Sequence, residues 1–160
     1  MREVGNCIWD VRIALGGWHP KLAMSELCCA DISQDTVESL KKFKFRKCNS
    51  TVALILKIDK ESLTLEIESI LEDTTVENLK DCLPSHQPRY ILLSYRYEKE
   101  DGRVSFPYCL LFSTPQGSPT NLKMLYAASL TTVTNKSEVT KVLELRDPEE
   151  LSDEWLKETF

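Results

Sequence analysis

The sequence predicts an α/β (α+β) fold, in which helices cover both faces of a mixed β-sheet. Two observations predict it. Short apolar or alternating segments typical of strands come in pairs, and capped amphipathic segments stand between these pairs. A chain of 160 residues can bury one sizeable hydrophobic core, which predicts one main domain. Strand pairs joined through helices are typical of a sheet whose two faces both carry helices.

The first predicted helix begins at about Ser33. Its apolar face consists of Val37, Leu40 and Phe43, and lysines gather at its C-terminal end, where the helix dipole favours positive charge. The basic run 41–47 most simply forms a solvated helix end with two core phenylalanines. A patch that binds phosphoinositide or nucleic acid is the alternative interpretation.

Strand signals follow in two pairs and a single last segment. Asp101-Gly102 is a strong hairpin signal, which joins the second pair. Pro107 cannot donate to a ladder and therefore predicts a bulge or an edge position. The predicted strands are 51–58 and a segment from Leu63 to Ile67, which form a first hairpin, then 89–98 and 103–113, and finally 139–145.

Two shorter helices are also predicted. A capping box from Thr74 to Glu77 begins the first of them, and Pro84 closes it. Asp147 and Pro148 begin a terminal helix, with a cap, a proline in the first turn and acidic residues behind it. The apolar residues that dock these two helices are Val76, Leu79 and Leu83 in the first, and Leu151 and Trp155 in the second.

The segment 119–129 predicts a helix with an unusual outward face. Ser118 offers a hydroxyl N-cap, and Pro119 suits the first helical position. The face that can be buried holds Leu122, Leu125, Tyr126 and Ser129; the outward one holds Lys123, Met124, Ala127 and Ala128. A flexible thioether, two methyl groups and one cation suit a groove in a partner. The alternative interpretation is an ordinary core helix whose apolar face has an irregular edge.

Composition restricts the classes of function. The net charge of −5 argues against an electrostatic grip on nucleic acid, and no run of about 20 apolar residues predicts a membrane span. Six cysteines without a C-x-x-C pair indicate free thiols in a reducing compartment, so we expect a cytoplasmic protein. Residues 1–23 lack a sustained period and contain Gly16-Gly17, which predicts a poorly ordered extension before a domain over 24–160.

Signals for catalysis are weak throughout the chain. The two histidines, His19 and His86, lie in the extension and in a proline-flanked loop, and no nucleophile motif accompanies them. The cysteines lack the paired spacing of a metal site, and the five glycines form no phosphate-binding loop. We therefore expect a binding module that is not an enzyme and uses neither a metal nor a cofactor.

Several segments together resemble the glia maturation factors of the actin-depolymerising factor homology family. The resemblance extends from Met24 to about Phe160 and departs from the family pattern at Lys123 and Leu130. The order and spacing of the segments make it specific. They are 42–47, 57–60, 83–90, 94–97 with 101–105, 112–115, 124–127 and 154–156.

The resemblance implies a five- or six-stranded mixed sheet and a monomeric, non-enzymatic protein that binds the actin-related protein 2/3 complex. Such binding would inhibit branch nucleation and promote debranching. The implied first surface contains Ser25, Glu26, Asn121, Lys123, Met124, Ala127 and Ala128; the second contains Lys99, Glu100, Asp101, Arg103, Glu149 and Glu150. The alternatives are cofilin-like binding of actin itself and a phosphoinositide-binding adaptor.

Overall fold

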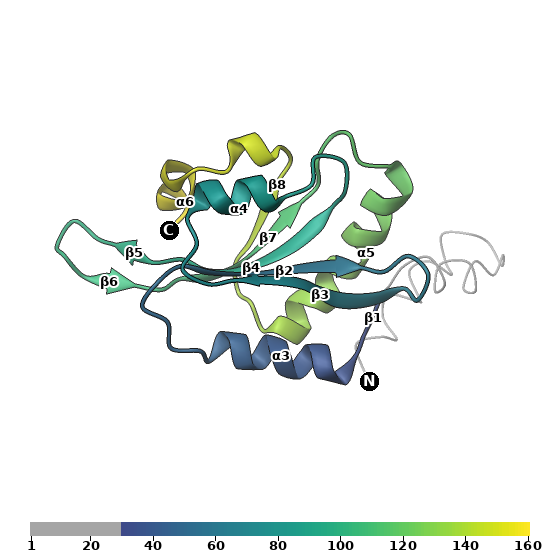
Figure 1. Ribbon diagram of the computed structural model, residues 1–160, viewed down its shortest axis with the longest axis horizontal. Coiled ribbons are helices and arrows are strands. Elements are labelled where there is room, and N and C mark those ends of the chain that lie inside the picture. The colour runs from purple at the N-terminus through teal and green to yellow at the C-terminus, as the bar shows by residue number, and fades with distance from the viewer. Residues whose placement is uncertain (1–29) are drawn as a thin grey trace, which may run out of the picture.

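The computed structural model describes residues 30–160. The predicted extension 1–23, together with Ser25 and Glu26, lies outside these residues. Figure 1 shows a central sheet with helices above and below it, and a two-stranded hairpin that projects from one end. This arrangement confirms the α/β fold that the sequence predicts.

Six strands in the order β1-β3-β2-β4-β7-β8 form the main sheet. The outermost pairs, β1 with β3 and β7 with β8, are parallel, and the inner pairs are antiparallel. The sheet is therefore mixed, as predicted, and β2 and β3 form the expected hairpin. The strands are β1 Asp31–Ile32, β2 Val52–Ile58, β3 Thr64–Leu71, β4 Arg89–Ser94, β7 Tyr108–Ser113 and β8 Val142–Leu145.

Alternation along the central strands supplies a hydrophobic core on each face of the sheet. Leu54 and Leu56 of β2 belong to one core with α3 (Gln34–Lys44) and α5 (Thr120–Ser137). Ala53 and Ile55 of the same strand belong to the other, with α4 (Val76–Cys82) and α6 (Asp153–Thr159). Successive side chains of a strand point to opposite faces, so one apolar strand serves both cores.

The predictions of one continuous strand over 89–98 and another over 103–113 are wrong, because each of these segments is divided into two strands. The chain leaves the main sheet after β4 and forms a separate hairpin of β5 (Tyr97–Glu98) and β6 (Val104–Ser105). Pro107 lies in the second gap and cannot donate a ladder hydrogen bond, but its carbonyl oxygen accepts one from the Tyr95 backbone N–H at 3.0 Å. Pro107 thus separates β6 from β7, whereas we expected a bulge or an edge position within one strand.

Several predicted boundaries are also corrected. Pro119 occupies the N-cap of α5, and the Ser118 hydroxyl is buried without a hydrogen-bond partner in the described part of the chain, so Ser118 is not the cap. Thr75 rather than Thr74 caps α4, because its hydroxyl accepts from the Asn78 N–H at 3.2 Å. The last strand is shorter than predicted, and Leu63 precedes β3 with a φ of 51°.

The terminal helix is divided into two pieces. Asp147 caps only the short 3-10 helix η1 (Pro148–Glu150), and Ser152 caps α6 anew through the Trp155 N–H at 3.2 Å. Leu151 lies between the two pieces and is buried in the core that α4 and α6 share. Trp155 packs against the same core, as predicted.

Candidate partner-binding surfaces

A pair of tyrosines fixes α5 on the sheet. The Tyr126 hydroxyl accepts a hydrogen bond from the Ile58 N–H at 2.8 Å, and the Tyr90 hydroxyl donates to the Tyr126 carbonyl oxygen. The two ring centroids lie 5.0 Å apart, and both side chains are fully buried. Burial raises the pKa of Tyr126 and of Tyr90, so both phenols remain neutral hydrogen-bonding groups. Because side chain and backbone are both held, the outward face of α5 has a defined position.

Ser129 joins the same helix to the first residue that the structure describes. Its hydroxyl oxygen accepts a hydrogen bond from the Ala30 N–H at 2.9 Å and donates to the Leu125 carbonyl oxygen, also at 2.9 Å. Both residues of the first hydrogen bond are buried. Glu26 precedes Ala30 by four residues, a span of at most about 14 Å. The Ala30–Ser129 hydrogen bond attaches the chain beside α5. The segment that contains Ser25 and Glu26 is therefore attached close enough to reach this helix.

We call the outward face of α5 the helix surface. It consists of Asn121, Lys123, Met124, Ala127 and Ala128. Met124 is 68% exposed, an unusual value for a large apolar side chain. Asn121 and Ala127 are also exposed, and Ala128 is half-buried. Leu122, Tyr126 and Ser129 are buried on the opposite side, as the sequence predicts. Small residues around one flexible apolar side chain permit close approach of a partner.

Lys123 and Leu130, the two positions at which we expect a departure from the family pattern, have structural roles here. The Lys123 ammonium donates to the Gln116 carbonyl oxygen at 2.9 Å, which directs this lysine toward the loop before α5. Leu130 packs against the core that α5 shares with α3. Lys123 thus points toward this loop, and Met124 is the exposed large apolar side chain of the helix surface.

The hairpin surface consists of Lys99, Glu100, Asp101 and Arg103 at the β5–β6 tip, with Glu149 and Glu150 in η1. At the tip, the Gly102 N–H donates to the Lys99 carbonyl oxygen at 2.9 Å, and Gly102 takes a φ of 81°, which favours glycine. Arg103 and Asp101 form an ion pair of 3.6 Å that is widely exposed. Such a pair contributes about 0–1 kcal/mol, so the tip is free to meet a partner.

The structure does not bring the two parts of the hairpin surface into contact. Figure 1 shows the tip at the far left and η1 above α4, and no hydrogen bond or ion pair within residues 30–160 joins them. Glu149 instead forms an ion pair with Lys80 of α4, and the hydrogen bond to Glu149 raises the Lys80 pKa. The base of the hairpin does contact α6, through a 2.9 Å hydrogen bond from the Tyr95 hydroxyl to Asp153.

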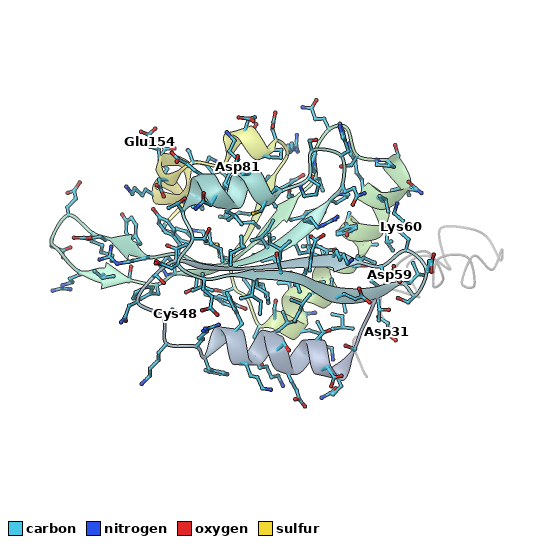
Figure 2. All side chains as sticks on the ribbon, in the orientation of Figure 1. Asp31, Cys48, Asp59, Lys60, Asp81 and Glu154 are labelled. Atoms are coloured by element: carbon cyan, nitrogen blue, oxygen red, sulfur yellow. The ribbon has the colours of Figure 1, made fainter. Side chains whose placement is uncertain are left out.

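A hollow of about 270 Å³, which we did not predict from the sequence, lies beside the start of α5. Leu122 and Tyr126 line it together with Asp59 and Lys60, which Figure 2 shows at the β2–β3 turn. Beneath it Arg89 is buried and donates to both carboxylate oxygens of Glu68, at 2.8 and 3.2 Å. No motif signals this ion pair, because its members stand 21 residues apart.

Other kinds of site find no support in residues 30–160. This part of the chain holds no cluster of histidine, cysteine, aspartate or glutamate arranged for a metal ion. Three of its cysteines, Cys48, Cys82 and Cys109, are free thiols. None of its helices is long and apolar enough to cross a membrane.

The family follows from comparison with known proteins. Residues 29–160 match the family model described as cofilin/tropomyosin-type actin-binding protein. Glia maturation factor beta of Homo sapiens is 45% identical over 136 residues, which are 84% of this chain and 96% of that protein. The chain belongs to the glia maturation factors. The Drosophila melanogaster glia maturation factor is 41% identical over 134 residues, 84% of this chain and 97% of that one.

Solved structures agree with this assignment. The solution structure of the Caenorhabditis elegans glia maturation factor is 44% identical, has a TM-score of 0.74 and covers 84% of this chain and 97% of that one. Plasmodium berghei actin depolymerization factor 2 has a TM-score of 0.70 at 22% identity, covers 82% of this chain and 96% of that one, and shows the fold alone. The glia maturation factor resemblance and the actin-depolymerising factor homology fold are thus confirmed.

Proposed function

We propose that this protein binds the actin-related protein 2/3 complex, inhibits nucleation of branches and promotes debranching. Membership of the glia maturation factors supports an actin-related role. The single observation that carries the proposal is the 68% exposure of Met124 on a helix that buried tyrosines hold in place. An anchored helix with one adaptable apolar side chain suits the groove of a partner. The protein then works as a monomer in the cytoplasm, on the actin cytoskeleton.

The helix surface makes the principal contact in this proposal, with Ser25 and Glu26 beside it. The Ala30–Ser129 hydrogen bond supports their proximity, because it attaches the chain next to α5. The hairpin surface makes a second, weaker contact, because its charges are exposed and their ion pairs are screened by salt. The tip and the η1 residues Glu149 and Glu150 contact separate parts of the complex, since they do not contact each other.

Binding to actin itself is the second candidate. The matched family model, a cofilin/tropomyosin-type actin-binding protein, favours it. The acidic residues of the hairpin surface count against strong binding to filaments, because the family resemblance implies that cofilin-like proteins bind filaments through a basic second site. A phosphoinositide-binding adaptor has less support. Two of the cations in the run 41–47 are already paired, Lys44 with Glu138 at 2.7 Å and Arg46 with Glu72 at 2.6 Å.

One experiment separates these candidates. The protein is mixed with purified actin-related protein 2/3 complex, with bare actin filaments, and with vesicles that contain phosphoinositides, and the bound fraction is measured by sedimentation. We expect binding to the complex, weak binding to filaments, and lower branch density in a reaction that contains the complex. Strong severing of filaments without the complex, or no effect on branching, contradicts the proposal.

A further inference from the structure

Among residues 30–160, most of the outer edge of β3 has no neighbouring strand. β1 pairs with only Thr64 and Leu65, and within residues 30–160 the remainder of β3, from Glu66 to Leu71, has hydrogen-bonded partners on the β2 side alone. Figure 1 shows β1 beside only one end of β3, with α3 beneath the sheet. An unpaired edge presents backbone N–H and C=O groups that a further strand can use.

An apolar hollow lies directly under this edge. Ile70 of β3 and its cross-strand neighbour Leu54 form its roof, and Phe43 of α3 lies at its side. The hollow measures about 390 Å³, more than the one beside α5. Ile70 is 49% exposed, although it stands next to a core that buries Leu54. Ile70 therefore gives the hollow an exposed apolar wall that an aliphatic side chain of a partner can cover.

Cations form the outer rim of this hollow. Lys42, near the C-terminal end of α3, and Arg46, just after this helix, both line it. Arg46 already pairs with Glu72, whereas in the described part of the chain Lys41 and Lys42 pair with no carboxylate. Glu66 of β3 is exposed and lies on the opposite face, because Leu65 and Ile67 on either side of it face the core that α3 covers. The two faces of the edge therefore differ in charge, which selects the orientation of any strand that binds there.

We propose that the β3 edge binds an extended segment of a partner protein as an additional strand. Toward α3 this segment carries aliphatic side chains, which fill the hollow beside Ile70, followed by acidic side chains, which pair with Lys42. Main-chain hydrogen bonds provide affinity in such strand addition, and the alternating side chains provide specificity. A second copy of this chain fits less well, because it would bring a second basic rim against the first.

This binding surface is independent of the helix surface. The hollow and the edge share no residue with Asn121, Met124 or Ala127, and they depend on α3 and β3 instead of α5. The chain can therefore hold a peptide at the edge while the helix surface contacts another protein. Loss of either contact leaves the other in place, so separate experiments decide the two proposals.

The test uses the full chain and a fluorescent peptide in which isoleucine and threonine alternate, followed by glutamates on the isoleucine side. One control peptide has lysines instead of glutamates, and another has prolines at alternate positions, which remove the N–H donors. We expect the parent peptide to bind at least about tenfold more tightly than either control, a difference of about 1.4 kcal/mol. Binding should also slow amide exchange within residues 66–71.

Two substitutions on the protein complete the test. Ile70→Lys and Lys42→Glu should each weaken binding about tenfold or more. Val142→Lys on β8, where the replaced side chain is 38% exposed at the other sheet edge, and Lys157→Glu on α6 are the matched controls and should bind as the parent does. If Ile70→Lys unfolds the chain, the control peptides still decide the question with the unaltered protein.

Other occupants give distinct results. Equal binding of the proline peptide, protection of amides elsewhere than β3, or retention of phosphoinositide vesicles in place of the peptide overturns the proposal. A dimer that forms with rising protein concentration and is abolished by Ile70→Lys also overturns it, because the edge then serves a second copy.

Discussion

The helix surface and the tip of the hairpin surface are both exposed, but different contacts hold them in place. Behind Met124, buried residues such as Tyr126 and Ser129 anchor α5 to the sheet and to Ala30. Within the part of the chain that the structure describes, a glycine turn and an exposed ion pair are what hold Asp101. Binding at the helix surface therefore depends on a rigid support, whereas the tip depends on charge. Four predictions test this difference.

Tyr126→Ala should have the largest effect. It removes a fully buried ring together with the acceptor for the Ile58 N–H, and loss of a large aromatic side chain from a core typically costs about 3–5 kcal/mol. The free energy of unfolding, measured with urea, should fall by that amount. Met124→Ala, the control on the outward face, should change it by less than about 0.5 kcal/mol. Similar small changes in both variants would mean that the tyrosine does not anchor α5.

Met124→Asp should separate binding from stability. An anchor residue in a helix-groove interface typically contributes about 2 kcal/mol or more, which corresponds to roughly thirtyfold in affinity for the actin-related protein 2/3 complex. The free energy of unfolding should remain within about 0.5 kcal/mol, because the side chain is already in solvent. Val142→Asp, a charge placed on another exposed apolar side chain, is the control for binding. A folded Met124→Asp protein that still inhibits branching would refute the helix surface.

The base of the hairpin should respond to high pH. Burial, and next the hydrogen bond to Asp153, raises the pKa of Tyr95 to about 12, above its ordinary value of about 10. The neutral phenol therefore contributes stability that is fully present below about pH 10 and is lost as the pH rises toward 12. Between these values, unfolding free energy should fall more steeply in the parent than in Tyr95→Phe, by at most about 1.4 kcal/mol per pH unit. Parallel slopes would show that Tyr95 is not responsible.

Charge reversal at the tip should have the smallest effect on stability. Glu100→Lys with Asp101→Lys should leave the free energy of unfolding within about 0.5 kcal/mol, because these side chains are exposed and their ion pairing is weak. Co-sedimentation with actin filaments should increase at low salt, and the gain should disappear at high salt, where exposed charges are screened. A gain that persists at high salt, or none at low salt, would contradict an electrostatic role for the tip.

Local patterns predicted most of the secondary structure correctly. The first helix was predicted to begin at about Ser33, and Ser33 is the N-cap of α3, where its hydroxyl accepts from the Thr36 N–H at 3.2 Å. Leu122 and Tyr126 are buried on the face that their spacing indicates. Such features depend on residues a few positions apart, and that information lies within the segment itself.

The errors occur where distant segments compete for the same backbone. Residues 95–98 have a strand-like composition, yet the chain leaves the main sheet there, and β1 attaches to β3 through two residue pairs that no local pattern announces. The Asp147 cap was recognised, but a second cap at Ser152, after the buried Leu151, divides the predicted helix. In these cases tertiary packing outweighs local propensity.

The candidate site divides in the same way. The sequence by itself determined that α5 has an apolar face and a face of Met124, Ala127 and Ala128, because helical periodicity fixes which residues share a side. Only the tertiary structure decided that Lys123 turns to the Gln116 carbonyl oxygen, that Ser129 holds Ala30, and that the tip lies apart from Glu149. These contacts join groups that are far apart in sequence or that no local pattern links, and folding alone brings such groups together.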